Sequence, residues 1–249
     1  MAEVLARLDE VRPERQVFTL QYALCDSPGD MALVEYLSGR AEVNRNPQPG
    51  VLTNTGYMCS VAYARSKASV PTGSFSRSIS SLDRFALAER LIAEAQATAS
   101  LATVDDLFRL LDQVALRPSF QGLARWALRR EPPTQTQWTT VFDPQLRRVH
   151  WRAQGSLSTW TCELTRLDFD GRQPARAIDV RTPGGGGASS RLYPFEVEDN
   201  RRPVEASFRP LGSTFPAPAR EALATYPETF DCVSTRSIDE THLKEIPDQ

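Results

Sequence analysis

The apolar residues of this 249-residue chain change their spacing twice, and this change limits the folds open to it. They alternate with polar residues in short runs over residues 18–55, recur with a helical period over residues 82–114, and alternate again from residue 137. Alternation predicts half-buried strands, and the helical period predicts amphipathic helices. Strands, then helices, then strands predict an α+β domain in which helices cover the faces of antiparallel sheets.

Turn residues and helix caps set the expected boundaries. Strands are expected at residues 18–23, 31–37, 41–44, 51–55, 137–142, 148–152, 158–167, 176–180 and 192–197, and helices at 2–11, 82–95, 103–114 and 120–128. Residues 64–80 are rich in Ser, Gly and Pro and are expected to form a loop, and the four glycines at 184–187 predict a flexible surface loop. Five prolines after residue 200 predict irregular structure. We therefore expect one domain over residues 1–199 and a Pro-rich C-terminal extension over residues 200–249.

Length and charge exclude several classes of protein. No stretch approaches 18 apolar residues and residues 1–15 carry charges throughout, so neither a membrane span nor a secretory signal is expected, and the chain as written is expected to be cytoplasmic. A formal net charge of −2 and a pI near 5.8 give no electrostatic footprint for nucleic acid or anionic lipid. We expect neither as a partner.

Cysteine and histidine positions disfavour a metal site or a catalytic triad. The four cysteines contain no CxxC pair, and the two histidines, His150 and His242, lie far apart in the sequence. His150 is expected at the surface of a strand and His242 in a solvated tail. The four glycines lack a following Lys-Ser/Thr pair, so they predict no phosphate cradle. We expect no metal and no cofactor.

Several motifs occur in one order along the chain. They are residues 22–30 with 33–36, Gly-Val-Leu-Thr-Asn at 50–54, Ser-Ser-Leu-Asp-Arg-Phe at 80–85, residues 139–143 with 149–152, and Leu-Tyr-Pro-Phe-Glu at 192–196. In this order they resemble the choloylglycine hydrolase family, the linear amide C–N hydrolases that include bile salt hydrolases and penicillin V acylases. The resemblance runs from about residue 3 to residue 196.

The resemblance implies an N-terminal-nucleophile (Ntn) hydrolase fold, an αββα sandwich of antiparallel sheets. In that family an N-terminal Cys attacks the amide, and its own α-amino group, which titrates near pH 8, serves as the base. By position, Asn54 resembles the Asn whose side-chain amide helps to form the oxyanion hole, and Arg84 resembles the Arg near the nucleophile. The substrate implied is a small acyl amide, and bile-salt conjugates, penicillin V and acyl-homoserine lactones all remain open.

The family's leading Cys and the motifs that follow it are absent from this sequence, since the chain opens on Met1-Ala2. Cys59 is disfavoured as a substitute because no Arg-x-x-Asp string follows it, and Cys25 is expected to be buried in a strand. We expect the fold to be incomplete at its N-terminus. Three interpretations stay open: a hydrolase whose nucleophile-bearing segment lies outside this chain, an inactive relative that acts as a binding or interaction module, and an unrelated α+β domain. Possible partners are a complementing N-terminal segment or a second copy of the chain.

Overall fold

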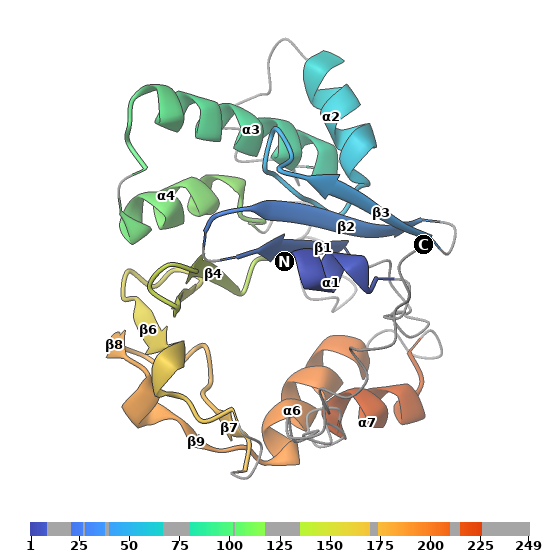
Figure 1. Ribbon diagram of the computed structural model, residues 1–249. Helices are drawn as coiled ribbons and strands as arrows, with labels where there is room; N and C mark the ends of the chain where they lie inside the picture. The colour runs from blue at the N-terminus through green and yellow to red at the C-terminus, as the bar shows by residue number, and fades with distance from the viewer. Residues whose placement is uncertain are drawn as a thin grey trace, which may run out of the picture.

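The structure is a computed structural model that describes residues 1–8, 21–26, 28–37, 40–66, 80–101, 103–117, 135–169, 174–209 and 215–225 (Figure 1). Its helices are α1 (Ala2–Ala6), α2 (Tyr57–Ser66), α3 (Ser81–Ala97), α4 (Val104–Val114), α6 (Val197–Phe208) and α7 (Ala217–Thr225), with 3₁₀ turns η1 (Leu164–Arg166) and η2 (Ser189–Arg191). Its strands are β1 (Gln21–Cys25), β2 (Met31–Leu37), β3 (Arg40–Arg45), β4 (Trp138–Asp143), β5 (Arg148–Ala153), β6 (Trp160–Glu163), β7 (Arg176–Ala177), β8 (Gly186–Gly187) and β9 (Tyr193–Pro194).

The first sheet is an antiparallel meander with β2 between β1 and β3. Helices α2 and α3 lie over one face of this sheet (Figure 1). There Leu33 of β2 packs with Tyr57 of α2 and Phe85 of α3 in a hydrophobic core. Val51, in the loop between β3 and α2, packs into the same core. The core therefore fixes where that loop leaves the sheet.

The second sheet has the strand order β4-β5-β6-β8, in which β6 and β8 are parallel and the other pairs are antiparallel. Trp151, Trp160, Cys162 and Ala188 form a buried hydrophobic cluster against it. Arg152 of β5 joins this sheet to α4, because its guanidinium pairs with Asp105 and its Cζ lies 4.3 Å from the centre of the Phe108 ring. These two contacts join helix α4 to the second sheet.

The two central helices begin within one residue of where the sequence predicts. The Asp83 N–H donates to Ser80 Oγ over 3.1 Å at the start of α3, and Thr103 forms a capping box with Asp106 at the start of α4. Such caps satisfy backbone N–H groups that have no partner inside the helix. The strands expected at 31–37, 41–44, 137–142 and 148–152 are confirmed to within one residue at each end. The expected helix at 120–128 lies outside the described residues.

Three local predictions near the first sheet and at the late strands are wrong. Residues 51–55 are irregular, with a bend at 54–55, rather than a strand, and residues 64–66 belong to α2, which the sequence does not predict. The late strands are shorter than expected: β6 gives way to η1 after residue 163, β7 covers two residues, and β9 is followed by α6 from residue 197. Short, weakly alternating segments carry little information about where pairing stops.

Gly186 and Gly187 form strand β8 of the second sheet, so the prediction of a flexible loop over residues 184–187 is wrong for these two. The N–H of Gly186 donates to the carbonyl of Thr159 over 2.8 Å, and residues 186–187 pair with β6. A Cβ built on Gly185 would lie 2.7 Å from the Thr159 carbonyl oxygen. Glycine therefore allows a close approach of two backbones here.

We expect Gly185→Ala to lower the free energy of unfolding by about 1–3 kcal/mol, because the added methyl group meets backbone rather than a movable side chain. Gly187→Ala is the matched control, since nothing lies within 4 Å of its Cβ position. It should change stability by no more than about 0.5 kcal/mol. Thermal unfolding of both variants measures the difference, and equal losses would contradict the close-approach explanation.

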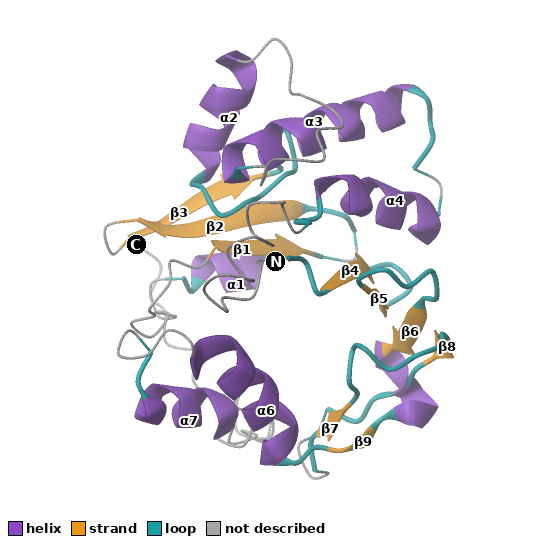
Figure 2. Ribbon diagram, turned by 180° about the vertical axis from the view of Figure 1, so that it is seen from behind, coloured by secondary structure: helices purple, strands orange, loops and turns teal. Residues whose placement is uncertain are grey.

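Two helices lie in the described part of the chain after residue 196, which corrects the prediction of irregular structure for residues 200–208 and 217–225. Figure 2 shows α6 and α7 side by side, and ion pairs join them between Arg201 and Glu221 and between Arg220 and Glu205. Pro218 is the second residue of α7, where its missing N–H would have no helical partner. Pro203 lies inside α6 and removes one helical hydrogen bond there. The expected domain boundary at residues 199–200 falls within α6.

His150 is buried in β5, so its expected place at the surface is wrong. Its Nδ1 lies 2.9 Å from Thr161 Oγ1 on β6, and its side chain belongs to the few buried polar groups of the described chain. Burial lowers the pKa of His150 below its ordinary value because desolvation disfavours the imidazolium, and this effect outweighs the opposite influence of Asp143. His242 lies outside the described residues.

This lowered pKa gives an expected pH dependence of stability. The unfolded chain binds a proton at His150 more readily than the folded chain, so the free energy of unfolding falls as the pH drops below about 7. Because His150 binds at most one proton, it can change the free energy of unfolding by at most about 1.4 kcal/mol per pH unit. Chemical denaturation of the wild type and His150→Gln between pH 7.5 and 5 measures it. A variant with the same slope as the wild type would contradict a role for His150.

Candidate functional site

Asn54 and Arg84, the two residues singled out by the resemblance, lie together. Asn54 is exposed in the loop that follows β3, and Arg84 is partly buried in the first turns of α3. Arg84 Nη2 donates a hydrogen bond to Asn54 Oδ1 over 3.3 Å, although 30 residues separate them in the chain. A guanidinium has only donors, so the Asn54 oxygen must face it and the Asn54 amide N–H groups are left for another acceptor. Asn54 Nδ2 has no hydrogen-bond partner among the described residues.

The loop that carries Asn54 is fixed to α3 by a second contact. Ser81 Oγ donates to Thr53 Oγ1 over 3.0 Å, one residue before Asn54. Neither residue is predicted by sequence analysis as part of the site, although Thr53 stands in the Leu-Thr-Asn motif and Ser81 in the Ser-x-x-Arg-Phe motif. The two motifs are thus joined by two side-chain hydrogen bonds, Ser81 to Thr53 and Arg84 to Asn54.

Arg84 carries a positive charge that the described part of the chain does not neutralise. No carboxylate of the described residues forms an ion pair with it. Its neighbour Asp83 accepts hydrogen bonds from Tyr63 Oη, over 2.5 Å, and from Ser80 Oγ, over 2.8 Å. Arg84 Nε is buried and has no hydrogen-bond partner among these residues. Burial lowers the pKa of the Arg84 guanidinium below its ordinary value, with desolvation as the cause.

The cysteines do not complete this pair of residues. Cys25 and Cys59 are exposed and Cys162 is buried, so the expected burial of Cys25 is wrong. Cys25 is the last residue of β1, where its Sγ contacts the Asp26 carbonyl oxygen at 3.6 Å. No hydrogen bond joins any of these three cysteines to Asn54 or Arg84 within the described residues. Cys232 lies outside them.

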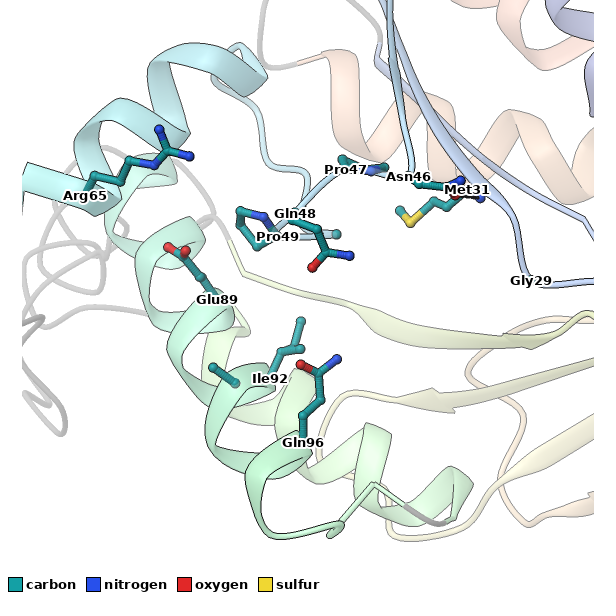
Figure 3. A pocket seen from close by; sticks show the side chains of 12 residues that line it. Gly29, Met31, Asn46, Pro47, Gln48, Pro49, Arg65, Glu89, Ile92 and Gln96 are labelled. Atoms are coloured by element: carbon teal, nitrogen blue, oxygen red, sulfur yellow. Dashed lines mark hydrogen bonds between the residues drawn. The ribbon is translucent and has the colours of Figure 1, made fainter.

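A pocket of about 510 Å³ opens farther along α3 (Figure 3). Met31, the loop at residues 46–50 and the side chains of Arg65, Glu89, Ile92 and Gln96 line it. Neither Asn54 nor Arg84 is among its described lining residues. The pair of Asn54 and Arg84 and this pocket therefore lie at different positions along α3.

No group of three or more His, Cys, Asp or Glu side chains that suits a metal ion occurs among the described residues. In the same residues, none of the helices has the length and apolar character to cross a bilayer.

The described fold matches solved hydrolase structures. Penicillin V acylase from Agrobacterium tumefaciens superposes with a TM-score of 0.59 at 19% sequence identity, covering 79% of this chain and 63% of the acylase. The described chain therefore has an α+β fold like that of this acylase. An arginine-to-leucine variant of conjugated bile acid hydrolase from Clostridium perfringens matches with a TM-score of 0.51 at 15% identity, over 66% of this chain and 55% of that one. A cysteine-to-alanine mutant of that enzyme gives 0.50 at 14% identity, over 62% and 53%.

These matches confirm the Ntn-hydrolase-like α+β fold expected from the sequence. The chain spans less than two thirds of the length of the structures it resembles. No protein-family model matches the chain. No curated protein matches it either.

Proposed function

We propose that this chain supplies the oxyanion side of an active site that hydrolyses non-peptide linear amides. The observation that carries the proposal is the hydrogen bond from Arg84 to Asn54, which joins two motifs 30 residues apart and leaves the Asn54 amide free to donate. The likeness in fold to penicillin V acylase and conjugated bile acid hydrolase supports the same reaction class. Acyl amides of those two kinds are the substrates to test first.

In the proposed reaction a thiolate attacks the amide carbon and the carbonyl oxygen becomes an alkoxide. The Asn54 Nδ2–H donates to that oxygen, which stabilises the tetrahedral intermediate by about 3–4 kcal/mol in comparable sites. The C–N bond then breaks, the leaving amine takes the proton first removed from the thiol, and water cleaves the resulting thioester. Arg84 holds the Asn54 oxygen and lowers the pKa of the thiol through its positive charge.

The attacking thiol belongs, in this proposal, to an N-terminal Cys on polypeptide outside residues 1–249. Cys25 and Cys59 are poor substitutes because neither has a hydrogen bond to Asn54 or Arg84 within the described residues. The alternative is a relative that binds acyl amides or a protein partner without cleaving. Exposed Trp138 and Phe142 on β4, an edge of the second sheet as described, favour a surface that takes a partner.

The test uses the product of the natural gene, carrying a tag fused after the last codon and purified from its own host. Its intact mass and N-terminal residue are determined, and penicillin V and conjugated bile acids are supplied as substrates. We expect an N-terminal Cys and release of the free amine. Binding without amine release would favour the non-cleaving alternative. Absence of both binding and turnover would contradict the proposed site.

A further inference from the structure

The buried polar side chains in the described part of the chain are Glu35, Ser60 and His150. Two of these, Glu35 and Ser60, hold the loop that carries Asn54. Glu35, in the middle strand β2, is 1% exposed, and Ser60 of α2 is fully buried. Burying a carboxylate costs free energy unless hydrogen bonds replace its lost water. The partners of Glu35 therefore indicate what its carboxyl group does there.

Glu35 binds the first residue of helix α2. The Tyr57 N–H donates to Glu35 Oε1 over 3.0 Å and to Oε2 over 3.1 Å, and Gln21 Nε2 donates to Oε1 over 2.6 Å. Tyr57 comes three residues after Asn54, so this contact fixes the end of the Asn54 loop to the sheet. A carboxylate is also favourable at this place because the N-terminus of a helix carries partial positive charge.

Ser60 and Ser81 hold the same loop from two helices. Ser60 Oγ, on α2, donates to the carbonyl oxygen of Thr55 over 3.2 Å, and Ser81 Oγ, on α3, donates to Thr53 Oγ1 over 3.0 Å. The residues on either side of Asn54 are thus each fixed by a side chain of a helix. A donor aimed at an oxyanion works only if its position is set before the reaction, since misplacement by about 1 Å can cost a hundredfold in rate.

We propose that Glu35 is a positioning residue that holds the Asn54 amide in place through the N-terminus of α2. Ser60 holds the same loop through its hydrogen bond to the Thr55 carbonyl oxygen. This inference rests on the function proposed above for Asn54. Glu35 itself touches no reacting atom, because it is buried behind the loop and bonded to Tyr57 and Gln21.

The test compares Glu35→Gln with Glu42→Gln. Glutamine keeps the volume of the buried side chain but places an amide N–H₂ where one oxygen accepts from Tyr57. Glu42 is the control, since it is the register partner of Glu35 on β3 and is exposed. Hydrogen exchange of the backbone amides of residues 53–57 is measured in both variants and in Ser60→Ala, which serves if Glu35→Gln does not fold.

We expect exchange at residues 53–57 to rise about tenfold or more in Glu35→Gln and in Ser60→Ala, with β4–β6 unchanged. Equal exchange in Glu35→Gln and Glu42→Gln would overturn the proposal, as would unchanged exchange in Ser60→Ala if Glu35→Gln is unfolded. This measurement needs no activity, so it decides the role of Glu35 even if the wild type hydrolyses no amide. In that case it is the proposed function that fails.

Kinetics separate positioning from plain stabilisation. In the natural gene product, Glu35→Gln should lower kcat about ten- to a hundredfold and change KM less than about threefold. Added to Asn54→Ala, the same substitution should lower kcat by less than about threefold, because the amide it positions is already gone. An equal loss in both backgrounds would show that Glu35 acts independently of Asn54 and would overturn the proposal.

Discussion

Replacing Asn54 with alanine is expected to lower kcat for amide hydrolysis by about a hundredfold or more in the natural gene product. The substitution removes an amide N–H₂ that has no partner among the described residues, while the Asn54 oxygen accepts from Arg84. Because Asn54 is exposed, its loss creates no cavity, and the free energy of unfolding should fall by only about 1 kcal/mol for the lost hydrogen bond to Arg84. Steady-state kinetics and thermal unfolding measure the two effects.

Asn54→Asp separates donation to the substrate from contact with Arg84. An ionised aspartate accepts the hydrogen bond of Arg84 but has no N–H to offer an oxyanion. We expect it to lose as much activity as Asn54→Ala and to be more stable than Asn54→Ala, since it neutralises the partly buried guanidinium. Asn44→Ala, on β3 and outside the proposed site, serves as the control and should keep wild-type activity. Full activity in Asn54→Asp would contradict the oxyanion role.

The helices α3 and α4 could be predicted from the sequence because their signals are local. Ser80 and Thr103 cap the helices within three residues of their own positions, and the apolar stripes follow directly. Strand β2 could be predicted for the same reason, from seven residues between two turns. The nearness of Asn54 and Arg84 is not local. Only the resemblance to a family assigns both residues to one site, and the hydrogen bond shows that they lie together.

Helix α2 could not be predicted because its start depends on a distant residue. The N–H of Tyr57 is satisfied by Glu35, 22 positions earlier in the chain, rather than by a neighbouring Ser, Thr or Asp. Gly185 is a similar case, since its tight contact with Thr159 exists only once the second sheet has formed. The prediction of irregular structure from proline content failed for a different reason. Pro218 lies in the first turn of α7, where proline is tolerated, so a count of prolines does not exclude a helix.

Replacing Arg84 with methionine is expected to make the protein more stable and less active. The buried Nε has no partner among the described residues, and an unsatisfied buried donor costs about 1–3 kcal/mol. Methionine has a helix propensity close to that of arginine and a similar unbranched stem, so α3 should accept it. Part of the gain is offset by loss of the hydrogen bond to Asn54. We therefore expect a net rise of about 1 kcal/mol in the free energy of unfolding, measured by chemical denaturation.

The same substitution should lower amide hydrolysis about a hundredfold, because Asn54 loses the partner that orients it and the attacking thiol loses a nearby cation. Without that cation the pKa of the thiol rises, so the acid limb of the kcat/KM profile should move to higher pH. Arg65→Met is the control, since Arg65 is exposed on α2 and should leave both properties unchanged. If Arg84→Met were instead less stable than the wild type and unchanged in activity, Arg84 would be a structural residue and the proposed site would lose its cation.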